Sequence, residues 1–104
     1  MDFVLVYMTM KNKEEAGTIG RTLVEERLAG CVNIIDNVTS IYRWNGEICA
    51  DNETVMLAKT SADKFDALSE RVRQIHSYEC SCIVSLPLSD GSGDYLNWLT
   101  EGLS

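Results

Sequence analysis

The sequence predicts an α+β sandwich of the ferredoxin-like βαββαβ class, with a long hairpin between the second and third strands and a short C-terminal helix. Two observations support this prediction. The spacing of apolar residues changes from strand-like to helix-like and back twice along the chain, and an Asn-Gly pair stands between two long β-rich stretches. In this split βαβ–βαβ order, both helices cover one face of a four-stranded antiparallel sheet.

The first part of the chain has the pattern of a strand followed by a helix. The run FVLVYM is apolar on both of its alternating faces, which is typical of a central strand. Over residues 12–30 the spacing becomes helical, and the expected apolar face comprises Ala16, Ile19, Leu23, Val24 and Leu28. Asn12 and Glu15 resemble a capping box at the start of the helix, and Gly30 suits the left-handed position after its last turn.

The second and third strands form the predicted hairpin. The stretch CVNIIDNVTSIYRW leads to Asn45-Gly46, a strong signal for a tight turn, and the return stretch EICADNETVMLAKT has a similar length. The two stretches therefore predict one long antiparallel ribbon, in which Trp44 faces Glu47 across a two-residue turn. The Asp36-Asn37 pair interrupts the apolar pattern and predicts a bulge.

The second half of the chain repeats the order of helix and strand. Ser61 is the expected N-cap of a helix with an apolar stripe of Phe65, Leu68, Val72 and Ile75. CSCIVSLPL then predicts a fourth strand, with Cys80, Cys82, Val84, Leu86 and Leu88 on one face. SDGSG predicts a loop, and DYLNWLTEGL a short C-terminal helix. The 104 residues fit a single domain, 1–104.

Composition and charge exclude several classes of partner. Nine basic and sixteen acidic residues give a net charge of −7, so we expect no binding to the polyphosphate backbone of a nucleic acid. No apolar run approaches the about 20 residues that span a bilayer, and MDFVLVYMTMKNKEE lacks the features of a secretory signal. We therefore expect a cytoplasmic protein without a membrane segment, whose four cysteines are reduced thiols.

One face of the predicted sheet has no cover. With both helices on one side, either the odd-numbered or the even-numbered apolar residues of FVLVYM face water. The long hairpin adds further apolar edge, and a contiguous apolar surface of this extent indicates a partner. We expect a homo-oligomer that buries the open face, with hairpin strands pairing across subunits.

Five stretches cover nearly the whole chain: ERLAGCVNI, SIYRWNGEI, ETVMLAKT, IHSYE and DYLNWL. In their order and spacing they resemble the divalent-cation-tolerance family, CutA, whose members are trimers of ferredoxin-like subunits related in architecture to PII signalling proteins. The resemblance implies a homotrimer and a link to copper and other divalent cations. The family usually has prolines where this chain has Ser77 and Ser81, so this turn lacks the stiffness that two prolines give.

Four residues are candidates for a metal site: His76, Cys31, Glu79 and Met8. Copper favours thiolate, thioether and imidazole, and zinc accepts thiolate, imidazole and carboxylate. We therefore expect a divalent metal ion, copper first and zinc second, and no organic cofactor. CxxC, HxxxH and HExxH spacings are all absent from the sequence, so such a site must be assembled in space, within one chain or across a subunit boundary.

Each candidate also has a structural interpretation. His76 stands in the last turn of a predicted helix, where it suits hydrogen bonds to exposed carbonyls or the helix dipole. Cys31 suits a small core position that opens a buried strand. Glu79 suits an ion pair with Lys59. The two thiols of CSC suit packing within the fourth strand or, if that face opens on solvent, adventitious chelation of a soft metal.

We expect no enzyme activity, because a single histidine without an orienting partner is a poor activator of a nucleophile and the glycines fit no nucleotide motif. Two functions remain. The first is a trimeric cytosolic protein that binds divalent metal ions such as copper without turnover. The alternative is a PII-like regulatory or scaffold module that senses a small ligand in an intersubunit cleft or docks a partner protein. Four aromatic residues suit such a pocket or a subunit interface: Tyr42, Trp44, Tyr95 and Trp98.

Overall fold

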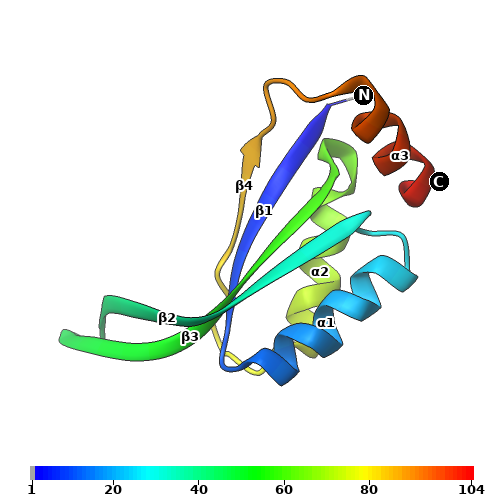
Figure 1. Ribbon diagram of the computed structural model, residues 1–104. Coiled ribbons are helices and arrows are strands. Elements are labelled where there is room, and N and C mark those ends of the chain that lie inside the picture. Colours follow the sequence, from blue (N-terminus) through cyan, green and yellow to red (C-terminus); the bar gives the residue numbers. More distant parts are fainter. Residues whose placement is uncertain (1) are drawn as a thin grey trace.

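The computed structural model describes residues 2–104 and confirms the predicted α+β class, in the order βαββαβα (Figure 1). Its elements are β1 (Phe3–Met10), α1 (Lys13–Glu25), β2 (Cys31–Trp44), β3 (Glu47–Ser61), α2 (Phe65–Ile75), β4 (Ile83–Pro87) and α3 (Gly93–Leu103), with a 3-10 turn (Ala62–Lys64) before α2. The strands form one antiparallel sheet in the order β2-β3-β1-β4.

The hydrophobic core lies between β1 and the helices α1 and α2. Val4, Val6 and Met8 of β1 are buried against apolar residues of α1 and α2, and Figure 1 shows both helices on the same side of the sheet. β1 occupies the middle of the sheet because its apolar residues alternate onto both faces. The even-numbered residues of β1 therefore face the core, and Phe3, Leu5 and Tyr7 face the open side.

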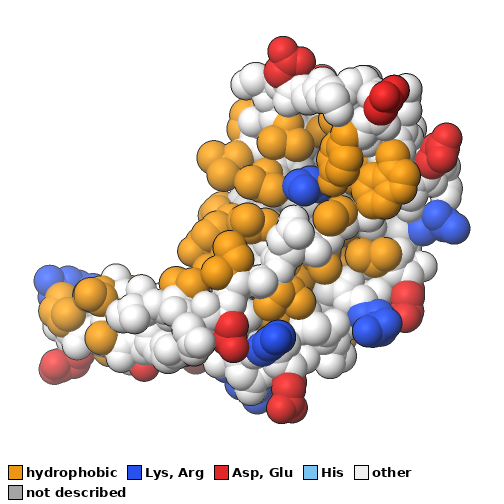
Figure 2. Space-filling model, in the orientation of Figure 1, with side chains coloured by type: hydrophobic (Ala, Val, Ile, Leu, Met, Phe, Trp, Pro, Cys, Tyr) orange, Lys and Arg blue, Asp and Glu red, His pale blue; other side chains and the backbone are white. Residues whose placement is uncertain are grey.

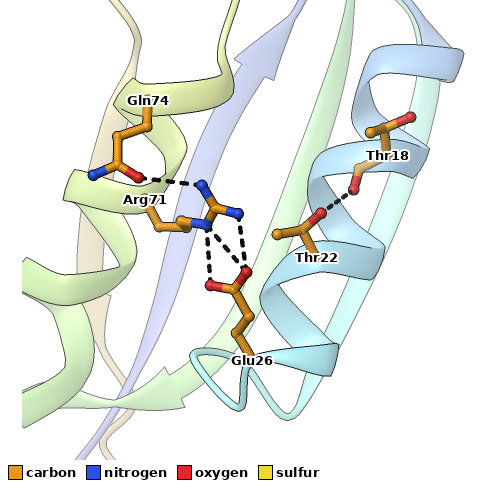
Figure 3. A network of polar contacts seen from close by, with 5 residues as sticks. All are labelled: Thr18, Thr22, Glu26, Arg71 and Gln74. Atoms are coloured by element: carbon orange, nitrogen blue, oxygen red, sulfur yellow. Dashed lines mark hydrogen bonds and ion pairs between the residues drawn. The ribbon is translucent and has the colours of Figure 1, made fainter.

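A polar network joins the outer surfaces of α1 and α2 (Figure 3). Arg71 forms an ion pair with Glu26, with Nε 3.0 Å from Oε1, and also donates to Oε1 of Gln74 at 3.1 Å. The Thr22 hydroxyl donates to the Thr18 carbonyl at 2.9 Å. Both partners of the ion pair are about one-third or more exposed, and such pairs contribute no more than about 1 kcal/mol. The apolar core therefore holds the helices on the sheet.

The ends of α1 differ from the prediction in three details. The Asn12 side chain accepts from the Glu15 amide at 2.8 Å, as expected, but Glu15 accepts from the Lys11 amide at 3.2 Å, so the capping box is only half formed. The left-handed residue after the helix is Arg27, with φ 60°, and not Gly30. Val24 is 40% exposed and lies outside the apolar face, because it sits at the edge of the helical stripe.

The ribbon of β2 and β3 forms as predicted. Asn45 and Gly46 have positive φ values of 50° and 80°, and Trp44 pairs with Glu47. The register shifts between Ile35 and Val38, which confirms the bulge, and Asn37 there has φ 60°. Asparagine tolerates this left-handed backbone better than most side chains.

Two boundaries in the second half of the chain were predicted wrongly. Ser61 makes no capping hydrogen bond through its side chain, and a 3-10 turn separates it from α2. β4 begins at Ile83, so Cys80 and Cys82 precede the strand instead of belonging to it. The reason is that His76 Nε2 bonds to the Thr9 carbonyl at 2.8 Å, at the point where the pairing of β1 with β4 would otherwise continue.

The sheet face opposite α1 and α2 is apolar and largely bare, as predicted. We call this surface the open face. It includes Phe3, Leu5, Tyr7, Leu57, Val84 and Leu86, which the strand register places on the same side. Val84 and Leu86 are 52% and 54% exposed. Figure 2 shows hydrophobic side chains gathered over β1 and β4 and beside α3.

Replacing Gly30 by alanine tests the packing of α3 on the start of β2. A Cβ atom at Gly30 would collide with Cδ1 of the buried Leu99 and lie 3.3 Å from the Leu99 carbonyl oxygen. We expect Gly30→Ala to lower the free energy of unfolding by about 1–3 kcal/mol, as overpacking does, measured by urea denaturation.

Gly17→Ala is the matched control, because nothing lies within 4 Å of a Cβ atom there. In this helical position alanine should raise the free energy of unfolding by about 0.5–1 kcal/mol. Equal effects of the two substitutions would contradict the packing described for Gly30.

Candidate functional site

A cleft of about 610 Å³ lies between the ribbon and the segment that joins α2 to β4. We call that segment, residues 76–82, the junction loop. Three kinds of side chain dominate the lining: carboxylates (Asp51, Glu53, Glu79), aromatic rings (Tyr42, Trp44, Tyr78) and thiols (Cys80, Cys82). The remaining lining residues are Thr9, Ser40 and Ser77, so none of the residues around the cleft is basic. The cleft is therefore suited to a cation.

The ribbon wall of the cleft follows from strand alternation. Tyr42 and Trp44 are two residues apart on β2 and share a side, and Asp51 lies on the same side because it pairs with Ser40. The Tyr42 hydroxyl donates a hydrogen bond to Asp51 Oδ2. This bond, with the nearby negative charge, raises the pKa of Tyr42 to about 12. Tyr42 therefore stays a neutral hydrogen-bond donor at neutral pH.

Glu53 is the most buried carboxylate of the cleft, with only 8% of the residue exposed. Its neighbour from the junction loop is Tyr78. Burial and a side-chain hydrogen bond with Glu53 raise the pKa of Tyr78 above its usual value. Tyr78 and Glu53 thus bring the junction loop and the ribbon together in the lining of the cleft.

His76 holds the junction loop in position. Its Nδ1 accepts from the Tyr78 amide at 3.0 Å, and its Nε2 lies 2.8 Å from the Thr9 carbonyl. An amide can only donate and a carbonyl can only accept, so this geometry requires a neutral ring protonated at Nε2. The imidazole also packs on the Tyr78 ring, with centroids 4.8 Å apart.

Glu15 ties the same loop to the start of α1. Its Oε2 accepts from the Ser77 amide at 3.1 Å and its Oε1 from the Lys11 amide at 3.2 Å. Burial alone would raise the pKa of Glu15, but a side-chain hydrogen bond with Ser77 and the hydrogen bonds from the Lys11 and Ser77 amides lower it overall. A proline at position 77 has no amide hydrogen to donate. Ser77 therefore provides an anchor for the loop that a proline at this position could not provide.

The chain does not bring the four predicted metal ligands together. Glu79 lines the cleft. His76 lies behind the loop with both ring nitrogens hydrogen-bonded. Met8 is fully buried in the core, and Cys31 is half-buried on the open face, opposite Lys59. Over residues 2–104, no group of three or more histidine, cysteine, aspartate or glutamate side chains is placed to hold a metal ion.

Two structural expectations for these residues were also wrong. Lys59 does not pair with Glu79: its Nζ donates to the Tyr95 hydroxyl at 3.3 Å and lies 5.2 Å from the centre of that ring. The cause is that Lys59 lies near the end of β3 that is next to α3, whereas Glu79 lies in the junction loop beside the ribbon. Cys31 shares the side of Lys59, so it is not a core residue.

Asp51 and Glu53 were not predicted as site residues. The signal was nonetheless present in the hairpin register. A two-residue turn at Asn45-Gly46 pairs Ser40 with Asp51 and Val38 with Glu53, which puts these acids on the side that carries Tyr42. Their approach to the junction loop depends on the tertiary fold and has no signature in the sequence.

No helix in residues 2–104 is long and apolar enough to cross a membrane. This finding agrees with the hydropathy of the sequence.

Comparison with known proteins identifies the class. Residues 4–102 match the family model of the CutA1 divalent ion tolerance protein. Over 97 residues the chain is 48% identical to the divalent-cation tolerance protein CutA of Thermus thermophilus, covering 93% of this chain and 94% of that one.

Solved structures agree with this assignment. CutA1 from Oryza sativa superposes with a TM-score of 0.97 at 34% identity, covering 100% of this chain and 95% of that one. The periplasmic divalent cation tolerance protein CutA from Archaeoglobus fulgidus gives 0.95 at 35% identity, with 98% and 99% covered. The fold and the sequence together define a divalent-cation-tolerance protein. This chain belongs to the CutA1 family.

Removing the charge of Glu15 tests how the junction loop is held. We expect Glu15→Gln to lower the free energy of unfolding at pH 7 by about 1 kcal/mol, because the amides of Ser77 and Lys11 lose a charged acceptor. The pKa of Glu15 is lowered in the folded chain, so its contribution is present above its unfolded pKa of about 4.3 and is lost as the pH falls through the folded value.

The difference between the variant and the parent chain should therefore shrink below about pH 4, as measured by urea denaturation at several pH values. Glu14→Gln, which changes an exposed carboxylate of the same helix turn, is the control and should change stability by less than about 0.5 kcal/mol. A pH-independent deficit in Glu15→Gln would contradict this account.

Proposed function

We propose that the protein is a homotrimer that binds divalent metal ions in its cleft without catalytic turnover. The observation that supports cation binding is the lining of the cleft: three carboxylates and two thiols with no basic side chain. Oxygen and sulfur ligands of this kind suit zinc and copper. The net charge of −7 further attracts cations.

The open face supports the oligomer. Exposed apolar side chains on this side occur on both edge strands: Ile35 on β2, and Val84 and Leu86 on β4. Surfaces of this kind usually mark an interface. The chain is also elongated, with extents of 45 × 25 × 23 Å, because the end of the ribbon projects beyond the rest of the sheet (Figure 1). The number three comes from the family resemblance.

The cleft and the open face lie on the same side of the sheet. On β3, Leu57 and Lys59 face the open side, and Glu53 and Asp51 follow at even intervals on that side. A copy that covers the open face therefore approaches the mouth of the cleft. In this arrangement Cys31, on the open face, is available to a neighbouring subunit. Glu79 lies within the cleft itself.

The four predicted ligands have different parts in this proposal. Glu79 binds the ion directly. His76 positions the loop that carries Glu79, since both of its nitrogens are already bonded. Cys31 completes a site only with another subunit, and Met8 stays in the core. The four free thiols suit the reducing cytoplasm, which we propose as the location.

The size of the cleft favours a second candidate function. A volume of about 610 Å³ is within the range of small-molecule sites and exceeds the space that a bare ion needs. The exposed rings of Tyr42 and Trp44 could stack on an organic ligand. In this alternative the protein is a regulatory or scaffold module that senses a small molecule or docks a partner protein.

The oligomer can be tested with a charge on the open face. Leu86 is 54% exposed in the single chain, so Leu86→Glu should fold normally but should dissociate the trimer, because the assembly would bury an unpaired carboxylate. Light scattering after size-exclusion chromatography gives the mass. Val24→Glu, on α1, is the control and should stay trimeric. A trimer with Leu86→Glu, or a parent chain that is monomeric at micromolar concentration, would refute the proposed assembly.

Cation binding can be tested by calorimetric titration with Cu²⁺ and Zn²⁺. Glu53→Gln and Glu79→Gln should each weaken binding by about tenfold, since about 1.4 kcal/mol is a typical value for one charge near the ion in a half-buried site. Glu14→Gln, far from the cleft on α1, is the control. Titration of His76→Ala and Cys31→Ala tests the other predicted ligands, and unchanged binding in both would remove them from the site. Equal affinity in all carboxylate variants would refute the cleft as the cation site.

A further inference from the structure

We propose that Cys80 and Cys82 form a two-thiolate site for a soft monovalent cation, with Cu⁺ as the reference ion. This inference deepens the proposed cation function, since it assigns an ion class to two residues of the same cleft. It depends on side chains that the initial set of four metal candidates did not include. Both thiols are free, and both line the cleft.

The position of the two cysteines differs from the one that the sequence predicts. If Cys80 and Cys82 belonged to a strand, the pairing of that strand would fix the positions of their side chains. In the structure they precede β4 and lie in the junction loop, outside helix and strand, where Cys80 is exposed and Cys82 is half-buried. One residue separates them. A short segment without regular hydrogen-bonded structure can bring two such sulfur atoms onto one ion by small backbone rotations.

Two ligands are enough for this class of ion. Soft thiolates select Cu⁺ over harder cations, and Cu⁺ accepts two thiolates in a linear arrangement. Divalent ions such as Zn²⁺ take four ligands, which is more than the two thiols supply. The thiol pair therefore favours the monovalent soft ion, whereas the carboxylates of the cleft favour the divalent ones.

Metal binding at this pair is an exchange of protons for an ion. A free cysteine thiol carries its proton at neutral pH, so an incoming ion must displace that proton. Binding converts two S–H groups and one Cu⁺ into a Cu(S)₂ unit with one negative charge and releases two protons. No electron is transferred, provided that the copper is supplied in the reduced state.

The surrounding charges support entry of a cation. Glu53 and Glu79 line the same cleft as the thiols. These carboxylates draw cations into the cleft, and the absence of a basic lining residue leaves the attraction unopposed. After binding, the Cu(S)₂ unit carries one negative charge, which the nearby carboxylates repel. The carboxylates therefore speed the entry of the ion into the cleft more than they stabilise the bound ion.

The test is a competition titration of the whole chain, reduced and without oxygen, against a chromophoric Cu⁺ chelator. The parent chain should take one Cu⁺ per chain from the chelator, release about two protons per ion and develop a thiolate-to-copper ultraviolet band. Cys80→Ser and Cys82→Ser should each lose this binding and the band. Cys49→Ser, which removes a thiol on the ribbon outside the cleft lining, is the matched control and should keep both.

The same variants separate this inference from the proposed divalent site. If Cys80→Ser and Cys82→Ser lose Cu⁺ but still bind Zn²⁺ like the parent chain, the thiol pair is the soft-ion site. If Glu53→Gln and Glu79→Gln leave Zn²⁺ affinity unchanged while Cu⁺ binding still needs both thiols, the divalent proposal fails and this one stands. Retention of Cu⁺ by either cysteine variant, loss in Cys49→Ser, or no Cu⁺ uptake by the parent chain would overturn it.

Discussion

The arrangement of two helices on one side of a four-stranded sheet determines most of what this protein can do. β1 must carry apolar residues on both faces to lie at the centre of the sheet, but α1 and α2 can bury only its even-numbered residues. The odd-numbered residues, with their neighbours on β3 and β4, remain on the other side. A folded single chain therefore keeps an exposed apolar surface on that side, of the kind that usually marks an interface. The same side of the sheet carries the cleft, so any assembly and any ligand share one surface.

Hydrogen bonds, in place of proline rings, hold the junction loop in position. The resemblance to CutA implies prolines at the two positions that Ser77 and Ser81 occupy in this chain, and serines lack the ring that would stiffen the backbone there. Hydrogen bonds offset part of the missing stiffness. Glu15 holds the Ser77 amide, and His76 bridges the Tyr78 amide and the Thr9 carbonyl. The single histidine of the chain is thus chiefly a support of the cleft wall.

Local patterns in the sequence were sufficient for the elements but not for the site. The period of the apolar residues and the Asn45-Gly46 turn predicted the order of helices and strands, and the bulge at Asp36-Asn37 was found from a single polar interruption. The start of β4 was missed because it depends on a contact between His76 and Thr9, which are 67 residues apart. Contacts of this length leave no periodic signal in the sequence.

The composition of the cleft was unforeseen for a related reason. Candidate ligands were chosen for their chemistry one residue at a time, and residues such as Met8 and Cys31 qualified on that ground. The fold then placed Met8 in the core and Cys31 on the open face. Asp51 and Glu53 were already aligned with Tyr42 by the hairpin register, but only the tertiary fold sets them opposite the junction loop. Ligand type is readable from sequence, whereas ligand proximity is a property of the fold.

The bulge in β2 also constrains the length of the ribbon. Between Ile35 and Val38, β2 advances three residues while β3 advances two. This one extra residue in β2 reverses the alternation of its side chains, so that Tyr42 and Trp44 point toward the cleft. Loss or gain of one codon between the bulge and the turn would send both rings to the opposite side. A change of two codons would keep both rings on the side of the cleft and would change only the length of the ribbon. Length variation in this part of the gene should therefore occur in even steps.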